Sequence, residues 1–322
     1  MHSHAPTATT ATNASSRTMW SQPLFCRAKI IGLYLVCLGK GKEASYWEPV
    51  AFKPACPTPT NFAPLPSNVA NVWDLFYKLH KDAFFKDRHY FAKEHLRLCS
   101  SLQPASVNST FASKKRRVVR ILDFGCGVGN SIIPLLETTC SSEVQVEYLG
   151  LDISPHAVGL LTTRLQAFPD HHLHCMALDL RDANKWNLIM QDFFHTVPNP
   201  QHNEGKFDFC LMIFTLSAFE PIDMQPAAKR VGKVLNGVLC FRDYSVGDMA
   251  MERFSNAQHV GRNLYQRQDG TLSFFFSPAG LIAMLTGVGM RCDWVKTLHR
   301  TIENRATQTV MKRSWLGAEF AN

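Results

Sequence analysis

The residues best spaced to do chemistry in this chain of 322 form a glycine-rich turn, GCGVG at residues 125–129. The turn follows a short apolar run, Val118 to Phe124, and precedes a helical pattern from Ser131 to Glu137. A glycine has no side chain to collide with a ligand, so such a turn lets the backbone approach one closely. Strand, glycine turn and helix in this order open a doubly wound α/β domain, whose ligands bind at the carboxyl ends of the strands.

Three acidic residues stand where such a ligand would need them. Asp123 lies two residues before the first glycine, Asp152 lies at the end of a second predicted strand (145–153), and Asp179 follows a third (172–178). The third glycine comes one residue too early for a nicotinamide dinucleotide fingerprint, which disfavours an oxidoreductase, and this spacing is typical of S-adenosylmethionine binding. We expect Asp152 to accept hydrogen bonds from both ribose hydroxyls and Asp179 to reach the adenine amine. The alternative is that both acids only cap the helices that follow them.

The surrounding pattern predicts the elements that hold these residues. A fourth strand is expected over residues 207–216, a helix over 227–235, a fifth strand over 237–242, and further strands at 274–276 and 310–316. Segment 195–206 is expected as a surface loop. Strands that alternate with helical stretches are typical of βαβ units. The predicted fold is therefore α/β: a Rossmann-like, doubly wound, mostly parallel sheet with an N-terminal helical extension.

Composition divides the chain into three parts. Residues 1–68 are expected as a targeting, disordered or linker segment, 69–117 as a basic helical cap with one or two amphipathic helices, and 118–322 as the catalytic domain. The first 42 residues contain no Asp or Glu, as in organelle transit peptides, so a mitochondrial location is the alternative to the expected cytoplasmic one. The apolar run Ile30 to Leu38 falls well short of the roughly 20 residues that cross a bilayer, and no membrane segment is expected.

Positive charge is concentrated in the first third of the chain. Residues 1–117 carry sixteen Lys and Arg against six Asp and Glu, whereas the rest carries eighteen against twenty. Such a segment attracts phosphates through counterion release, so a nucleic acid is the expected partner and a solvated basic surface is the alternative. The candidate phosphate contacts are Lys78, Lys81, Lys86, Arg88, Lys114, Lys115, Arg116 and Arg117.

Several chemistries are disfavoured by what the sequence lacks. The ten cysteines include no C-x-x-C pair, so neither a zinc ribbon nor a disulfide scaffold is indicated and no metal is expected. After the predicted fourth strand stands LSAFEP at residues 216–221, rather than the Asp/Asn-Pro-Pro-aromatic turn of methyltransferases that act on base amines. Cys210 lies inside that strand with no adjacent proline, so it is expected as core rather than as a nucleophile.

Longer blocks identify a family resemblance over residues 69–320. WDLFYK at 73–78 and FFKDRH at 84–89 resemble the N-terminal block of the eukaryotic tRNA 3-methylcytidine methyltransferases. In the same order follow ILDFGCGVGN at 121–130, MIFTLSA at 212–218, Arg-Asp-Tyr at 242–244 and NLYQRQDGTLSFFF at 263–276. Asn304-Arg305 and Arg313-Ser314-Trp315 also match. Ser245 and Gly247 depart from the family pattern of glycine and tyrosine.

The resemblance implies a class I methyltransferase with S-adenosyl-L-methionine as cofactor. The contacts it implies for the cofactor fall on Trp73, Tyr77, Gly125, Gly127, Asp152, Asp179, Leu180 and Ile213. Trp73 and Tyr77 lie one helical turn apart and can close over one ligand from the same face. For the acceptor pocket we expect Arg242, Asp243 and Tyr244 at the end of the fifth strand. The alternative for Arg242 and Asp243 is a structural ion pair behind the pocket.

The activity implied is formation of 3-methylcytidine in the anticodon loop of tRNA. Cytosine N3 has an in-plane lone pair and no hydrogen, so direct in-line transfer needs no general base, only positioning. A seryl-tRNA synthetase partner is implied by some members of the family. Alternatives are a methyltransferase of the same fold that acts on protein or on a small molecule, and an inactive cofactor-binding partner protein.

Overall fold

The computed structural model describes residues 69–82, 84–104, 116–304 and 309–322. Their centre is a seven-stranded sheet of order β3-β2-β1-β4-β5-β10-β9. Strands β1 to β5 pair in parallel; β10 pairs antiparallel with β5, and the outermost strand β9 pairs antiparallel with β10. The parallel strands are β1 (Arg117–Phe124), β2 (Val144–Asp152), β3 (His172–Ala177), β4 (Phe207–Ile213) and β5 (Leu235–Tyr244). The chain order changes direction between β1 and β4, which is where open α/β sheets form their ligand crevice.

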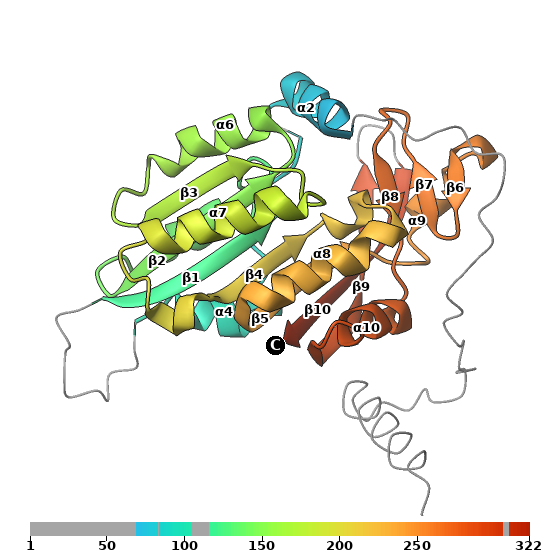
Figure 1. The fold of residues 1–322 in the computed structure, drawn as a ribbon. Coiled ribbons are helices and arrows are strands. Elements are labelled where there is room, and N and C mark those ends of the chain that lie inside the picture. Colours follow the sequence, from blue (N-terminus) through green and yellow to red (C-terminus); the bar gives the residue numbers. More distant parts are fainter. Residues whose placement is uncertain (1–68, 83, 105–115, 305–308) are drawn as a thin grey trace, which may run out of the picture. The chain divides into compact units, whose positions relative to one another are not determined.

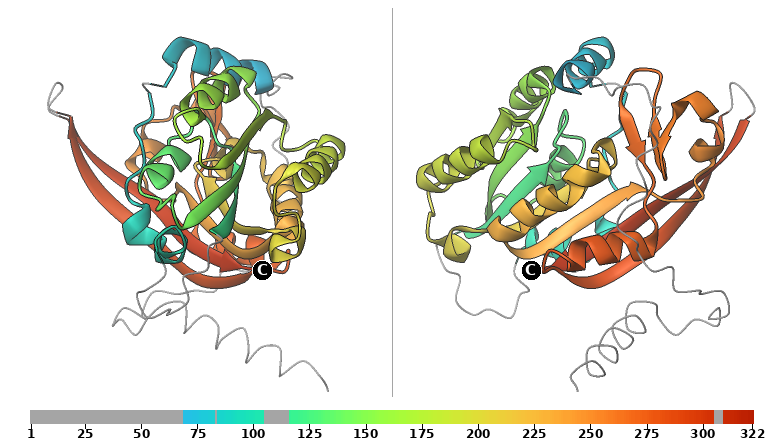
Figure 2. Two further views of the ribbon diagram at one scale, coloured as in Figure 1. Left: turned by 90° about the vertical axis from the view of Figure 1, so that its left-hand side faces the viewer. Right: turned by 45° about the vertical axis from the view of Figure 1, so that its right-hand side comes forward.

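Helices cover both faces of this sheet, as the alternating pattern predicts. Figure 1 shows α7 and α8 in front of the strands and α4 behind them, and the turned views of Figure 2 agree. The helices that connect or follow the strands are α5 (Ile132–Glu137), α6 (Pro155–Leu165), α7 (Ala183–Thr196), α8 (Pro221–Val234) and α10 (Pro278–Thr286). The doubly wound α/β prediction is confirmed.

The core lies where the central strands are buried on both faces. Six consecutive residues of β1 are buried, and Ile121, Tyr148 and Leu211 on three adjacent strands are completely inaccessible. Continuous apolar strands of this kind are typical of parallel sheets covered on both sides. The loops at the carboxyl edge of the sheet therefore follow strands that are buried on both faces.

A helical cap precedes the sheet. It consists of α2 (Val69–His80), α3 (Phe91–Glu94) and α4 (Leu96–Ser101), three helices where one or two were expected. Buried polar contacts join it to the sheet: Glu94 pairs with Arg242 on β5, and His95 Nδ1 lies 3.1 Å from Glu319 on β10. The residues that carry the family resemblance at 73–89 are thereby held beside the carboxyl edge.

A small second sheet follows β5 and was only partly predicted. It has the order β6-β7-β8, with β6 (His259–Gly261), β7 (Leu264–Gln266) and β8 (Leu272–Phe274), and the short α9 (Met249–Glu252) precedes it. The long hairpin β9 (Arg291–Asn304) and β10 (Thr309–Ala321) closes the chain. Sequence patterns gave the segment 310–316 within β10 and missed β9, whose mixed polar sequence has no clean alternation.

Two further boundaries differ from the predictions. Strand β4 ends at Ile213 rather than at 216, because Phe214 takes a left-handed backbone conformation with φ +55° and a short 3₁₀ turn (Leu216–Ala218) follows. The expected loop 195–206 begins inside α7 and contains a second 3₁₀ turn (His202–Gly205). Among the described helices, none is long and apolar enough to cross a membrane.

Candidate active site

Two adjoining pockets lie at the carboxyl edge of the parallel strands. The Tyr244 pocket is defined by Arg88, the glycine turn, Phe214, Tyr244 and Arg267; the Asp152 pocket is defined by Asp152, Asp179, Leu180 and Thr215. Six residues line both: Trp73, Tyr77, Gly125, Phe214, Ala218 and Leu272. A ligand that fills both pockets must pass between these shared residues, so they mark the place where two bound groups can meet.

The glycine turn has the conformation that its sequence predicts. Gly125, Gly127 and Gly129 all have positive φ, at +89°, +52° and +86°, a region that other residues seldom occupy. A Cβ on Gly125 would lie 2.2 Å from the Thr215 side chain, and one on Gly127 would lie 2.7 Å from the Tyr77 hydroxyl. The glycines are therefore needed for close packing of the pocket walls as well as for access to a ligand.

Asp152 ends β2 with its carboxylate held by backbone amides. Oδ2 accepts a hydrogen bond from the Gly127 amide at 2.8 Å, and Oδ1 accepts one from the Ser154 amide at 3.0 Å. Burial raises the pKa of Asp152, and these amides offset part of the increase. The cap of α6 is Ser154, whose hydroxyl accepts from the Ala157 amide, so Asp152 is not the helix cap.

Asp179 is anchored by a neighbouring arginine. Its carboxylate accepts hydrogen bonds from Arg181 Nε at 2.9 Å and Nη2 at 2.7 Å. Burial raises the pKa of Asp179, but the bonds from Arg181 outweigh it and the net effect lowers the pKa. The cap of α7 is Asp182. Neither strand-end acid serves as a helix cap, which removes the alternative considered for both.

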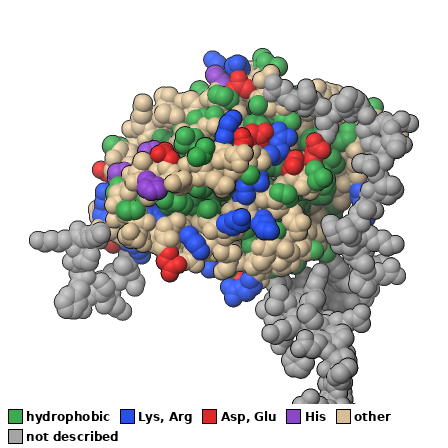
Figure 3. Space-filling view, viewed as in Figure 1, with side chains coloured by type: hydrophobic (Ala, Val, Ile, Leu, Met, Phe, Trp, Pro, Cys, Tyr) green, Lys and Arg blue, Asp and Glu red, His purple; other side chains and the backbone are tan. Residues whose placement is uncertain are grey.

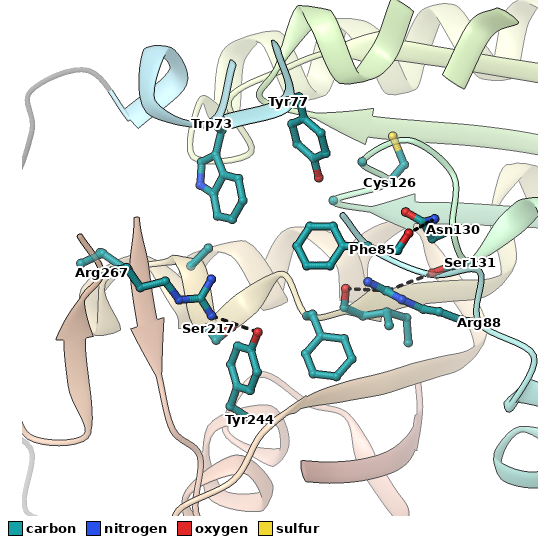
Figure 4. Close-up of a pocket in the computed structure, with 16 residues that line it drawn as sticks. Trp73, Tyr77, Phe85, Arg88, Cys126, Asn130, Ser131, Ser217, Tyr244 and Arg267 are labelled. Atoms are coloured by element: carbon teal, nitrogen blue, oxygen red, sulfur yellow. Dashed lines mark hydrogen bonds between the residues drawn. The ribbon is translucent and has the colours of Figure 1, made fainter. Parts of the chain in front are cut away.

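Helix α2 brings Trp73 and Tyr77 over the two pockets. Their rings lie 6.2 Å apart and both point down toward the glycine turn and Phe85 (Figure 4). Tyr77 is 6% exposed, and burial raises the pKa of its hydroxyl well above the usual value. Both side chains thus lie on the pocket side of α2, as their spacing of one helical turn predicts.

All eight predicted cofactor contacts line one of the two pockets. Gly127 and Ile213 line the Tyr244 pocket, Asp152, Asp179 and Leu180 line the Asp152 pocket, and Trp73, Tyr77 and Gly125 line both. Ile213 presents its backbone carbonyl, which accepts from Arg88 Nη1 at 3.2 Å. Leu180 is buried, and its carbonyl accepts from Arg230.

Of the three residues expected in the acceptor pocket, only one lines it in the structure. Tyr244 lines the Tyr244 pocket, whereas Arg242 and Asp243 line neither pocket. Asp243 accepts hydrogen bonds from the Ser217 amide at 2.9 Å and the Tyr244 amide at 2.9 Å, and burial raises its pKa to about 6. Asp243 therefore shapes the turn after β4.

Arg242 faces away from Asp243. It pairs with Glu94 of the cap, and its guanidinium lies 3.9 Å from the centre of the Tyr90 ring. The alternative of an Arg242–Asp243 ion pair is wrong, because adjacent residues on a strand point to opposite faces of the sheet. Ser245 and Gly247, the departures from the family pattern, also line neither pocket.

The predicted phosphate contacts fall into separate groups. Lys81 and Lys86 are exposed on the cap, and Lys78 pairs with Asp74 at 2.8 Å while 59% of its side chain stays exposed. Arg116 and Arg117 stand at the amino end of β1, at the opposite edge of the sheet from the pockets, and donate to backbone carbonyls such as Ser141 and Gln103. Lys114 and Lys115 lie outside the described residues.

Figure 3 shows acidic and basic side chains interspersed over α7 and α8, in line with the balanced numbers of acidic and basic residues after residue 117.

Arg88 is the exception in this set, because it lies inside the Tyr244 pocket. Nη1 donates to Ser131 Oγ and to the Ile213 carbonyl, both at 3.2 Å, and the guanidinium lies 5.2 Å from the Phe214 ring centre. Asn130 holds the same segment to the glycine turn by donating to the Phe85 carbonyl at 3.0 Å. The family motif at 84–89 is thus a wall of the pocket.

Among the lining residues that the sequence analysis did not name as site residues are Phe85, Phe214 and Arg267. Phe214 enters both pockets because of its left-handed backbone, and Arg267 reaches the Tyr244 pocket from the small sheet. Both belong to matched family blocks, so the resemblance contained the indication. No local pattern distinguishes them from ordinary core or surface residues.

The lining of the Tyr244 pocket limits the chemistry that it can support. Among its described residues there is no carboxylate or imidazole to take up a proton. The Cys126 thiol lines it, but burial raises the pKa of that thiol well above its usual value. The pocket suits an acceptor atom that arrives with a free lone pair and no hydrogen.

One buried group of described residues could hold a metal ion, and it lies away from both pockets. His95, Cys240 and Glu319 place their ligand atoms within 4.8 Å of one another. None of the three lines either pocket. Cys210 is inaccessible within β4, as expected of a core residue.

Comparison with known proteins agrees with this geometry. A family model described as "Methyltransferase domain" matches residues 122–237. The chain is 33% identical to the tRNA N(3)-methylcytidine methyltransferase Mettl2 of Drosophila melanogaster, over 79% of this chain and 71% of that protein. It is 31% identical to the tRNA N(3)-cytidine methyltransferase METTL2 of Danio rerio, over 81% and 78%. A solved SAM-dependent methyltransferase from Anabaena variabilis has the same fold, with a TM-score of 0.53 at 12% identity over 81% of this chain and 98% of that one.

Proposed function

Because the chain belongs to the family of tRNA N(3)-methylcytidine methyltransferases, we propose that its joined pockets transfer a methyl group from S-adenosylmethionine to N3 of a cytosine in tRNA. The observation that carries the proposal is the pair of adjoining pockets with six shared lining residues. The Asp152 pocket has the two acids that a ribose and an adenine require. The Tyr244 pocket has aromatic walls and no base, as an unprotonated ring nitrogen requires.

The residues present fit the cofactor. The buried Asp152 carboxylate faces a pocket and is oriented by two backbone amides, which leaves lone pairs on its oxygens for ribose hydroxyls. Asp179, held by Arg181 and lining the same pocket as Leu180, is the proposed acceptor for the adenine amine. The Ile213 carbonyl and the Arg88 guanidinium lie at the other end, where an amino acid's ammonium and carboxylate find partners.

S-adenosylmethionine, when bound, supplies a methyl group on a positively charged sulfur. Trp73, Tyr77 and Phe214 line both pockets and can hold the donor and the acceptor in line, and positioning of this kind is worth about 7 to 11 kcal/mol of a barrier. Their ring faces, with that of Tyr244, also favour a cation, and the positive charge passes from donor to base during transfer. The pocket therefore acts by alignment, desolvation and aromatic contact.

The base must leave its stack to reach this site. Watson–Crick pairing would hide N3, so we propose a flipped or unpaired cytosine of the anticodon loop as the acceptor, at a cost of a few kcal/mol for unstacking. A yeast relative that is 30% identical is named tRNA(Thr) (cytosine(32)-N(3))-methyltransferase. Exposed Lys81 and Lys86 on the cap are proposed phosphate contacts, and methylation should then weaken as salt rises.

Partner and compartment are proposed on the sequence alone. A seryl-tRNA synthetase partner rests on the family resemblance. A cytoplasmic location, with mitochondria as the alternative, rests on the composition of residues 1–42.

A fractionation assay tests the function. Purified protein is incubated with methyl-labelled S-adenosylmethionine and, separately, with tRNA transcripts, a protein extract and a small-molecule extract. Label in tRNA that disappears when the anticodon-loop cytosine is replaced by uridine supports the proposal. Label in the protein or small-molecule fraction alone contradicts it, as does a folded protein that labels nothing.

A further inference from the structure

Arg267 enters the Tyr244 pocket from the small second sheet. It follows β7, and its Nη2 donates to the Tyr244 hydroxyl at 2.9 Å, with the guanidinium 5.4 Å from the centre of that ring (Figure 4). Figure 4 places it across the pocket from Arg88, which bonds to the glycine-turn side through Ser131. Arg267 and Arg88 therefore lie on opposite walls of the Tyr244 pocket.

The half-buried Arg267 guanidinium has N–H groups that no described residue accepts from. A guanidinium has five N–H donors, and the described residues give this one a single acceptor, the neutral Tyr244 hydroxyl. No carboxylate of the described chain lies within ion-pair distance of it. The nearest candidates have other partners: Asp269 accepts from Thr271, and Asp243 accepts from Ser217 and Tyr244 amides.

A buried arginine elsewhere in the molecule, Arg120, has hydrogen-bond acceptors on all sides of its guanidinium group. Arg120 is inaccessible and donates to Glu147 and to three backbone carbonyls, those of Asn199, His202 and Lys206. Charged groups held away from water are normally paired in this way, because desolvation otherwise destabilises them. Arg267 differs: it is only half-buried, it lines the Tyr244 pocket, and none of its nitrogens is among the buried unpaired atoms of the described residues, so its remaining N–H groups are accessible to a ligand in that pocket.

We propose that Arg267 donates a hydrogen bond to the O2 carbonyl of the acceptor cytosine and so fixes the direction of the neighbouring N3. The proposal rests on the proposed function, since it assigns an atom of that substrate. O2 is bonded to the ring carbon beside N3, so a donor fixed on O2 leaves the ring one rotation in which N3 faces the shared residues Trp73 and Phe214.

Tyr244 has a supporting part in this arrangement. Its hydroxyl accepts from Arg267, and its ring contacts Phe214 at 5.2 Å between centres, so it links the arginine to the residue shared by both pockets. Uracil carries the same O2, so Arg267 orients the base and does not distinguish cytosine from uracil. It is a substrate contact with a positioning effect.

The test compares two RNA hairpins that differ in one atom. An anticodon stem–loop carries either cytidine or 2-thiocytidine at the target position, and single-turnover methylation is measured at saturating RNA and cofactor. Sulfur is a weak acceptor, so wild type should be slower on the thio substrate. Any intrinsic change in N3 reactivity is the same for all variants and cancels when their oxygen-to-sulfur rate ratios are compared.

The expected results are specific to the atom. Arg267→Ala should slow the cytidine substrate at least about tenfold, the usual size for loss of a charge-assisted hydrogen bond, and reduce the oxygen-to-sulfur ratio to that of the intrinsic chemistry. Arg267→Lys should restore part of the ratio, and Tyr244→Phe should lower it in part. Arg262→Ala, which changes an exposed arginine in the turn between β6 and β7, should keep the wild-type ratio.

Other outcomes overturn the proposal. If Arg267→Ala slows both RNAs equally and raises the RNA concentration needed for saturation, the arginine contacts a phosphate. If the ratio is unchanged, O2 has another partner. A wild-type protein that methylates neither RNA contradicts the proposed function itself, and binding of S-adenosylhomocysteine by each variant verifies that it is folded.

Discussion

The carboxylate of Asp74 on α2 accepts a hydrogen bond of 2.9 Å from the hydroxyl of Ser154, the residue that caps α6. The same oxygen accepts the His156 amide at 2.9 Å, and the other carboxylate oxygen pairs with Lys78 at 2.8 Å. Asp74 directly follows Trp73 in a helix that carries Tyr77 one turn later. This contact therefore fixes the aromatic pair above the pockets while lining neither pocket itself.

Loss of the Asp74 contact should weaken cofactor binding from outside the pocket. Asp74→Ala removes two hydrogen bonds between α2 and α6, and we expect the dissociation constant of S-adenosylhomocysteine to rise about tenfold in calorimetry. Asp82→Ala, an exposed acid beyond the same helix, is the matched control and should bind normally. Equal affinity for wild type and Asp74→Ala would show that α2 is located by its apolar packing alone.

Asp152→Ala should have the larger effect on the same measurement. It removes the acceptor proposed for both ribose hydroxyls and leaves the Gly127 and Ser154 amides without their carboxylate. The expected loss is roughly ten- to a hundredfold in affinity, with a smaller loss for Asp152→Asn, which keeps one acceptor. Unchanged affinity in a folded Asp152→Ala protein would place the ribose elsewhere.

The close approach of Gly127 to Tyr77 predicts a compensating pair. A Cβ at Gly127 would lie 2.7 Å from the Tyr77 hydroxyl and would sit on a backbone with φ +52°. Gly127→Ala should therefore lower both stability and cofactor affinity, and Tyr77→Phe should recover part of the loss by removing the colliding oxygen. The two changes would be additive if the hydroxyl were not the obstacle, which a double-mutant cycle of melting temperatures measures.

Two buried carboxyls predict how stability depends on pH. Burial raises the pKa of Asp123 to about 7 and that of Asp243 to about 6. A raised pKa means that the folded state holds the proton more tightly than the unfolded one, so their contribution to stability is full below about pH 4 and is lost as pH rises toward 6 and 7. Asp123→Asn should flatten the fall in unfolding free energy over this window, by on the order of a few kcal/mol.

That prediction is measured by urea unfolding at closely spaced pH values. Asp82→Asn, which changes an exposed acid, is the control and should retain the wild-type slope. If the unfolding free energy of wild type and of Asp123→Asn changed equally between pH 4 and 7, the raised pKa of Asp123 would be contradicted.

The buried pair between cap and sheet predicts a large loss of stability. His95 and Glu319 are 0% and 3% exposed, and their side chains meet at 3.1 Å. Removing one partner leaves the other buried and unpaired, so Glu319→Ala should cost about 3 to 5 kcal/mol in denaturant unfolding. Replacing both by apolar residues, as in His95→Phe with Glu319→Leu, should cost much less, and an equal cost would contradict the pairing.

The parts of the site that the sequence predicts are those fixed by local pattern. Gly125, Gly127 and Asp152 are set by strand, turn and helix within a few residues, so spacing alone places them. Phe214 and Arg267 depend on tertiary structure: the first on a left-handed backbone at the end of β4, the second on the docking of the small sheet. Neither feature produces a periodic sequence pattern from which it could be predicted.

The charge count predicted the kind of partner, a nucleic acid, better than it predicted which basic residues would contact phosphates. The basic segment at 114–117 suggested one phosphate-binding surface, yet Arg116 and Arg117 donate to backbone carbonyls at the far edge of the sheet. Arg88 was grouped with the surface cations and lies in the pocket. A count of charges cannot say which face of the fold each side chain occupies, because that depends on the packing of the cap.

The most direct test of the account is the identity of the methylated nucleoside. Wild-type protein and Asp152→Ala are incubated with S-adenosylmethionine and an unmodified tRNA that has cytidine in its anticodon loop, and the digested RNA is analysed by chromatography and mass spectrometry against 3-methylcytidine, 4-methylcytidine and 5-methylcytidine standards. We predict 3-methylcytidine from wild type and little or none from Asp152→Ala. A different methylated nucleoside, or equal 3-methylcytidine from both proteins, would contradict the site described.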